Sequence, residues 1–229
     1  MKLVFVHGAG ESSLSFYYQL RHFRNSKAID LPGHPTGTPC SNIDGYVEWV
    51  RGFNTARRYK DVVLCGHSMG GAIALQHAMR YPEELKGIIL IGSGARLRVH
   101  SDHLNLCKQP GAEYTMWLEG RRKSYKDVEP DIHQVLMRRA EEVGPGVELN
   151  DLQACDRFDV MESIESIRLP VQVICGSNDT MTPVKYSDYM THMIKGARQE
   201  VIDGGSHYVQ LEKYQKVNEQ IEKFLAALR

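Results

Sequence analysis

Residues 61–71 read DVVLCGHSMGG, an apolar run followed at once by the pattern G-x-S-x-G at Gly66–Gly70. The next residues, AIALQHAM at 72–79, are mostly good helix formers, and Tyr81-Pro82 ends them. A strand before the pattern and a helix after it are the setting of a nucleophile elbow, a tight turn that exposes one serine hydroxyl. We therefore predict that Ser68 is a nucleophile at the carboxyl end of a strand.

The tight turn around Ser68 requires glycine on both sides. It brings the strand and the helix so close together that a Cβ at Gly66 or Gly70 would collide with its neighbours. The start of the helix also leaves free N–H groups beside the serine, where they can stabilise developing negative charge. The alternative is a purely structural Gly/Ser turn, since the pentapeptide alone also occurs by chance.

The size and charge of the chain favour a single α/β core. Its 229 residues are enough for one sizeable core, and 28 basic residues balance 28 acidic ones. We therefore expect neither nucleic acid nor a membrane as partner. The first apolar run, Leu3–Val6, is too short for a signal peptide or a membrane span, so we expect a cytoplasmic protein. The five cysteines lack paired spacing, and we expect neither disulfides nor a bound metal.

Strand-like and helix-like segments alternate along most of the chain. Apolar runs predict strands at 3–6, 28–30, 62–65, 87–91, 171–175 and 199–202. Helical patterns lie between them at 14–23, 44–59, 70–81, 183–193 and 214–228. Short, almost continuously apolar strands joined by helices are typical of a parallel sheet covered by helices on both faces.

Residues 95–167 interrupt this alternation after the strand that ends near Ile91. They contain no strand-like run, but helical segments at 113–118, 130–143 and 149–158, with turns at Gln109-Pro110-Gly111 and Gly144-Pro145-Gly146. A connection this long within a compact domain is usually a functional lid. We predict a core formed by 1–94 and 168–229, and a helical cap formed by 95–167.

A nucleophilic serine needs a base and a carboxylate that orients the base. His207 follows the last predicted strand, and Asp179 follows the strand before it, so both should reach the same sheet edge as Ser68. His207 could instead be a surface histidine, and Asp179 could be only a cap of the next helix. Asp203 is the rival carboxylate, but it lies too close to His207 in sequence to orient it easily.

Five motifs occur in one order along the chain: HGAG at 7–10, DLPGH at 30–34, the elbow at Ser68, GSNDTMTP at 176–183 and GGSH at 204–207. Together they make the whole chain resemble a capped serine hydrolase of the α/β-hydrolase fold, similar to the carboxylesterases. Members of that family usually open with an antiparallel hairpin, whereas here the first strand begins at residue 3. The resemblance therefore implies a mostly parallel sheet of six strands, flanked by helices.

The resemblance also implies roles for particular residues. Ser68, Asp179 and His207 match the family's order of nucleophile, acid and base, and the N–H groups of Ala9 and Met69 match its oxyanion hole. A serine rather than an aspartate nucleophile implies attack on an acyl carbon, without a cofactor. We expect a carboxylesterase for small acyl esters. The alternatives are a thioesterase or carbon–carbon bond hydrolase, or a small-molecule receptor with vestigial hydrolysis.

Substrate contacts are harder to predict than the catalytic groups. We expect His67, Trp117 and Arg121 to contact the substrate, Arg121 through an anionic group. For large apolar cap residues such as Trp117 the alternative is packing against the core. For Arg121, which lies in a run of basic residues, the alternative is a solvated helix face. The sequence leaves open whether the protein is a monomer or a dimer.

Overall fold

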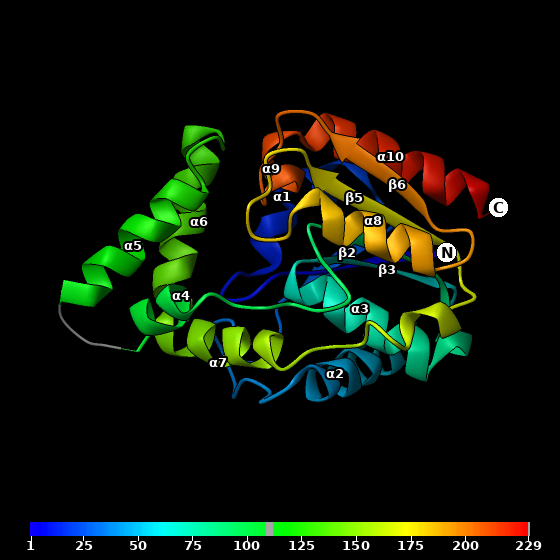
Figure 1. The fold of residues 1–229 in the computed structure, drawn as a ribbon, viewed down its shortest axis with the longest axis horizontal. Coiled ribbons are helices and arrows are strands. Elements are labelled where there is room, and N and C mark those ends of the chain that lie inside the picture. The colour runs from blue at the N-terminus through cyan, green and yellow to red at the C-terminus, as the bar shows by residue number, and fades with distance from the viewer. Residues whose placement is uncertain (109–111, 229) are drawn as a thin grey trace.

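The computed structural model describes residues 1–108 and 112–228, so the turn predicted at Gln109-Pro110-Gly111 lies outside the described residues. Its centre is a six-stranded sheet in the order β2-β1-β3-β4-β5-β6, in which every pairing is parallel (Figure 1). The strands are β1 (Lys2–Val6), β2 (Ser26–Ile29), β3 (Val62–His67), β4 (Leu85–Ile91), β5 (Val171–Gly176) and β6 (Arg198–Ile202). The predicted α/β fold with a six-stranded sheet is confirmed.

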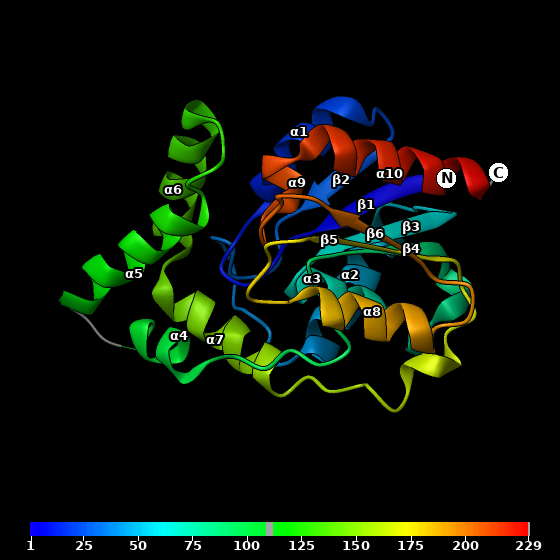
Figure 2. The ribbon, with the colours of Figure 1, turned by 45° about the horizontal axis from the view of Figure 1, so that its top comes forward.

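Helices cover both faces of the sheet (Figure 2). One face packs against α2 (Ile43–Ala56), α3 (Met69–Arg80) and α8 (Val184–Met193). The other faces α1 (Tyr17–His22), α9 (Val209–Glu212) and α10 (Tyr214–Ala227). Alternate strand residues supply the two cores: Val4 and Val6 join the first, whereas Leu3 and Phe5 join the second.

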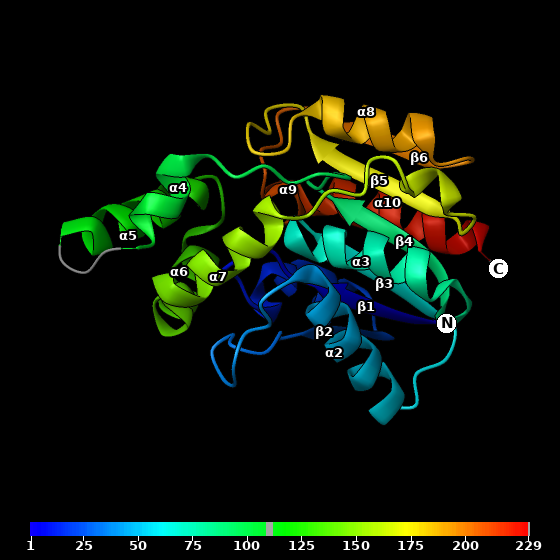
Figure 3. The same ribbon diagram turned by 60° about the horizontal axis from the view of Figure 1, so that its bottom comes forward.

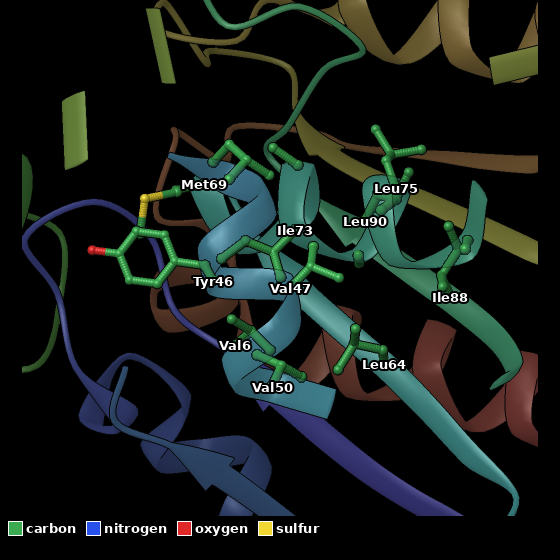
Figure 4. Packing of buried hydrophobic residues seen from close by; sticks show 14 of the residues in the cluster. Val6, Tyr46, Val47, Val50, Leu64, Met69, Ile73, Leu75, Ile88 and Leu90 are labelled. Atoms are coloured by element: carbon green, nitrogen blue, oxygen red, sulfur yellow. The ribbon is translucent and has the colours of Figure 1, made fainter. Parts of the chain in front are cut away.

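The larger core lies between the sheet and helices α2 and α3. Figure 4 shows Val6 and Leu64 from the strands meeting Val47 and Ile73 from the helices. All four side chains are fully shielded from solvent. Because both faces are buried at the centre of the sheet, β1, β3, β4 and β5 are apolar along almost their whole length, which is why the sequence revealed them. The edge strands β2 and β6 are partly exposed and carry more polar residues.

Between β4 and β5 the described residues form four α-helices that lie beyond the edge where the strands end (Figures 1 and 3). They are α4 (Ser101–Leu106), α5 (Ala112–Ser124), α6 (Pro130–Val143) and α7 (Pro145–Asp156). Among the described residues, no helix is long and apolar enough to cross a membrane.

Several helix ends differ from the predictions. Helix α1 covers only 17–22, because Ser12 caps a short 3-10 turn at Ser13–Phe16 before it. Helix α7 begins at Pro145 rather than 149, because Gly144 adopts a positive φ of 80° and proline fits the first helical position. Helices α4 and α9 were not predicted, since they have only six and four residues, respectively, and helices this short carry little periodicity.

The elbow brings three backbone segments closer together than any side chain would allow. A Cβ at Gly66 would lie 2.0 Å from the carbonyl oxygen of Gly70, and a Cβ at Gly70 would lie 2.1 Å from that of Val6. Helix α3 therefore starts in contact with both β3 and β1. This contact fixes the position of the turn that carries Ser68.

We expect Gly70→Ala to lower the free energy of unfolding by at least about 2 kcal/mol, because the new methyl group overlaps backbone that cannot move aside. Gly52→Ala is the matched control: Gly52 lies within α2, and a Cβ there meets nothing within 4 Å. That change should raise the free energy of unfolding by about 0.5–1 kcal/mol, since alanine favours the helix. Urea unfolding of both variants measures the difference; equal effects would contradict the close contact.

Candidate active site

Ser68 is held in a strained backbone conformation between β3 and α3. Its φ and ψ are 50° and −114°, outside the regions that a non-glycine residue ordinarily adopts. Its N–H donates to the carbonyl oxygen of Ile91 (2.9 Å), and its own carbonyl accepts from the Ser93 hydroxyl (2.8 Å). These contacts with β4 and the residues that follow it hold the strained turn in place.

His207 and Asp179 form a buried pair at the ends of β6 and β5. The Nδ1–H of His207 donates to Oδ2 of Asp179 at 2.9 Å, which leaves Nε2 for the pocket. Asp179 also accepts hydrogen bonds from the N–H and the hydroxyl of Thr182, both at 2.8 Å. Burial acts to raise the pKa of Asp179, but the charge and hydrogen bond of His207 and the bonds from Thr182 outweigh burial and lower it. Asp203, the rival carboxylate, is exposed.

The structure brings Ser68 and His207 together in one pocket of about 440 Å³. Ala9 lines it too, and apolar side chains from the segment after β4 and from α7 cover much of the remainder: Leu97, Val99, Leu152 and Cys155. A volume in this range suits a small organic ligand. In the described part of the chain, the Ser68 hydroxyl has no protein hydrogen-bond partner, so it is available to the pocket.

Two backbone N–H groups beside this pocket are unengaged. Among residues 1–108 and 112–228, no protein acceptor binds the N–H of Ala9 or that of Met69. Met69 is the first residue of α3, so its N–H has no acceptor within the helix. Both predicted oxyanion residues thus have an N–H without a protein partner; Ala9 lines the pocket together with Ser68, and Met69 follows Ser68 in the chain.

His67 lies behind the pocket and does not line it. Its side chain is fully buried, with Nδ1 3.0 Å from Oε1 of Glu11 and Nε2 2.9 Å from the carbonyl oxygen of His207. Burial raises the pKa of Glu11, but the charge of His67 prevails and lowers it to about 2. Burial lowers the pKa of His67, but Glu11 prevails and raises it. His67 therefore supports the backbone of His207 from within the protein, and its contact with substrate stays a prediction.

Trp117 and Arg121 belong to helix α5 and face the helices around them. The indole N–H of Trp117 donates to Glu148 at 2.6 Å, and both side chains are almost fully buried. Nη2 of Arg121 lies 2.6 Å from Glu148 and donates to the carbonyl oxygen of Ala9 at 3.1 Å. They line a smaller pocket of about 110 Å³ next to the one that holds Ser68. That they bind substrate stays a prediction, but Arg121 is not on a solvated helix face.

The sequence did not point to Glu11, Asp151 or Thr182, all of which are buried close to these groups. Thr182 had a signal, because Asp179 precedes it by three residues, the spacing of an aspartate that caps a turn. Asp151 had none, since its partner Gly10 lies 141 residues away. In the described part of the chain, no group of three metal-ligating side chains comes together.

His7 is a buried, neutral histidine. Its Nε2 accepts from the N–H of Leu31 at 3.1 Å, so the proton is on Nδ1, which donates to the carbonyl of Gly8 at 2.8 Å. Burial, aided by the nearby His34, lowers the pKa of His7 to about 4. In the folded protein His7 therefore stays neutral between pH 6.5 and 4, the pH range in which the same residue becomes charged in the unfolded chain.

We expect this difference to make the fold acid-sensitive. Between pH 6.5 and 4 the unfolded chain binds a proton at His7 and the folded protein does not, so stability falls as pH falls. A pKa of about 4 instead of 6.5 corresponds to roughly 3 kcal/mol at His7. Urea unfolding across this range should show a shallower dependence on pH in His7→Gln than in the wild type. An identical dependence would contradict the assignment, whatever the absolute stability of the variant.

Comparison with known proteins agrees with this geometry. The alpha/beta hydrolase family matches residues 3–220. A pimeloyl-(acyl-carrier protein) methyl ester esterase of Neisseria meningitidis is 27% identical over 193 residues, covering 79% of this chain and 61% of the relative. A solved thermophilic esterase is 30% identical, with a TM-score of 0.82, covering 99% of this chain and 90% of that one. The enol-lactonase of Burkholderia xenovorans LB400 shares the fold at 17% identity, with a TM-score of 0.86 over 98% of this chain and 91% of its own. The chain therefore belongs to the alpha/beta hydrolase family.

Proposed function

We propose that this protein is a serine carboxylesterase that cleaves small acyl esters through a covalent acyl-enzyme. The observation that carries the proposal is one pocket shared by a strained serine and a histidine that a buried aspartate orients. Two free N–H groups at Ala9 and Met69 complete the set that acyl transfer requires.

In this mechanism the Ser68 hydroxyl attacks the ester carbonyl, and Nε2 of His207 accepts its proton. Asp179 holds Nδ1–H of His207, which fixes the tautomer and stabilises the imidazolium that forms. The N–H groups of Ala9 and Met69 bind the oxyanion. His207 then protonates the leaving alcohol. Water, deprotonated by His207, releases the acid from Ser68 and restores the serine hydroxyl.

The pocket supports a small, largely apolar acyl group. Its wall of Leu97, Val99 and Leu152 offers apolar contact but no charged group. Arg98, which carries a charged guanidinium, lines the same pocket, as do His100 and His103. The names of the relatives agree with ester cleavage, since two of them are esterases and one is a lactonase.

Two alternatives share these residues. A thioesterase or a carbon–carbon bond hydrolase would use the same serine, and a receptor would bind its ligand and hydrolyse it at most once. A series of p-nitrophenyl esters with acyl chains from C2 to C12, compared with acyl thioesters, separates an esterase from a thioesterase and from a receptor. We expect sustained turnover that is fastest on the short esters. A single burst without further release would instead indicate a receptor.

We expect Ser68→Ala to abolish turnover of p-nitrophenyl butyrate and Asp179→Asn to lower kcat by about 10⁴-fold, because the amide stabilises the wrong histidine tautomer. Asp203→Asn is the matched control, since Asp203 is the exposed aspartate four residues before His207. It should retain wild-type kcat. Wild-type turnover by Ser68→Ala would refute the mechanism, and a large loss in Asp203→Asn alone would assign the acid to Asp203.

A further inference from the structure

The loop that follows β1 has a regular pattern of hydrogen bonds. The N–H of Gly8 donates to Oε2 of Glu11 at 3.2 Å, and its carbonyl accepts from Nδ1 of His7 at 2.8 Å. The carbonyl of Gly8 and the N–H of Ala9 belong to one planar peptide group and point in opposite directions. By binding the carbonyl, His7 therefore directs the N–H of Ala9 the other way.

The next peptide group, between Ala9 and Gly10, is bound at both ends by residues of the inserted helices. Nη2 of Arg121, from α5, donates to the carbonyl of Ala9 at 3.1 Å. Oδ2 of Asp151, from α7, accepts from the N–H of Gly10 at 2.9 Å. A cation thus meets the negative end of the peptide dipole, and a carboxylate meets the positive end. Rotating this peptide would place each charge against the wrong end, so the two side chains hold it in one orientation.

Close packing reinforces this arrangement. Gly10 has a φ of +63°, and a Cβ at this position would lie 2.2 Å from Nη2 of Arg121 and 2.8 Å from Cβ of Glu148. Glycine allows the loop to approach the helices, but it also allows more backbone conformations than any other residue. The neighbouring peptide thus needs external contacts to stay in place, and Arg121 and Asp151 supply them.

Both side chains are themselves fixed by further buried groups. Arg121 is 4% exposed and is paired with Glu148 at 2.6 Å. Asp151 is fully buried and accepts from Nε2 of His34 at 2.7 Å and from the hydroxyl of Tyr46 at 2.5 Å. Buried charged groups with several hydrogen bonds have little freedom to move. They therefore form a rigid support for the loop.

We propose that Arg121 and Asp151 are positioning residues that set the oxyanion-binding N–H of Ala9 by fixing the adjacent Ala9–Gly10 peptide. The proposal rests on the proposed function, and it deepens it: the inserted helices help to build the oxyanion hole as well as to cover the pocket. Among the described residues, the N–H of Gly8, the carbonyl of Gly8, the carbonyl of Ala9 and the N–H of Gly10 all have a protein hydrogen-bond partner, whereas the N–H of Ala9, which lies between them, has none. Neither side chain touches the reacting atoms.

This role differs measurably from binding an anionic substrate group. The oxyanion forms only on the way to the transition state, so a displaced N–H lowers kcat and leaves KM nearly unchanged. The loss is the same for neutral and anionic esters. An Arg121 that bound a substrate carboxylate would instead affect KM, and only for the anionic ester.

The experiment compares Arg121→Gln and Asp151→Asn with the wild type on p-nitrophenyl butyrate and on a p-nitrophenyl ester that ends in a carboxylate. We expect kcat to fall by about 10²-fold in each variant on both substrates, as for a displacement of about 1 Å at a reacting group. The affinity for a trifluoromethyl ketone, whose serine adduct carries an oxyanion, should fall by the same factor. Arg121→Lys should recover part of the loss, because the amine can still donate to the Ala9 carbonyl.

Matched controls are Arg122→Gln and Gln153→Ala, exposed neighbours on the same two helices, which should keep wild-type kcat. Thermal unfolding identifies any variant that has lost its fold. If one of the two variants does not fold, the kinetics of the other test the proposal. The proposal would be overturned if folded variants kept both the wild-type kcat and the wild-type affinity for the trifluoromethyl ketone. It would also be overturned if the variants changed only KM, and only for the anionic ester. Ser68→Ala distinguishes failure of this proposal from failure of the proposed function. If Ser68→Ala is inactive while the Arg121 and Asp151 variants keep wild-type kcat, only the positioning role is refuted. If Ser68→Ala is active, the serine mechanism and the positioning role are both refuted.

Discussion

The contact between the first turn of α3 and the ends of β1 and β3 is the constraint on which the rest of the site depends. A Cβ at Gly70 would overlap the carbonyl oxygen of Val6, and a Cβ at Gly66 would overlap that of Gly70, so only glycine permits the helix to start there. The approach leaves Ser68 at a positive φ with its side chain free. It also brings the start of α3 against the end of β1, from which the His7–Gly10 loop emerges.

Parallel strands explain why distant residues meet at this point. Asp179 and His207 follow neighbouring strands, β5 and β6, and Ser68 follows β3 on the other side of β4. All these strands end at one edge, so short loops are sufficient to bring the three side chains to one pocket. Titratable groups are buried in pairs here, Glu11 with His67 behind the pocket and Asp179 with His207 beside it, which keeps each orientation fixed.

The sequence was sufficient for features with a local signal. The six strands of the described residues were predicted, the central ones because burial on both faces makes them apolar. Ser68, Asp179 and His207 were proposed as catalytic groups because each follows a strand in a recognisable motif. Helix α4 was missed because six residues show no clear period. The partners of Arg121 were also beyond prediction, because the Ala9 carbonyl lies 112 residues away and backbone groups carry no sequence signal.

The two proposed oxyanion donors depend on different parts of the fold. The N–H of Met69 is fixed by the start of α3, and hence by the core that Figure 4 shows. The N–H of Ala9 depends on a loop whose outer side is bound by Arg121 and Asp151 of the inserted helices. Those helices also carry Leu152 and Cys155, which line the pocket. Helix α7 therefore both lines the pocket and, through Asp151, binds the N–H of Gly10. A change in α7 that reshapes the pocket also acts on this contact, so substrate fit and transition-state stabilisation are physically coupled. Altering the acyl preference without loss of rate would require substitutions that leave Asp151 in place.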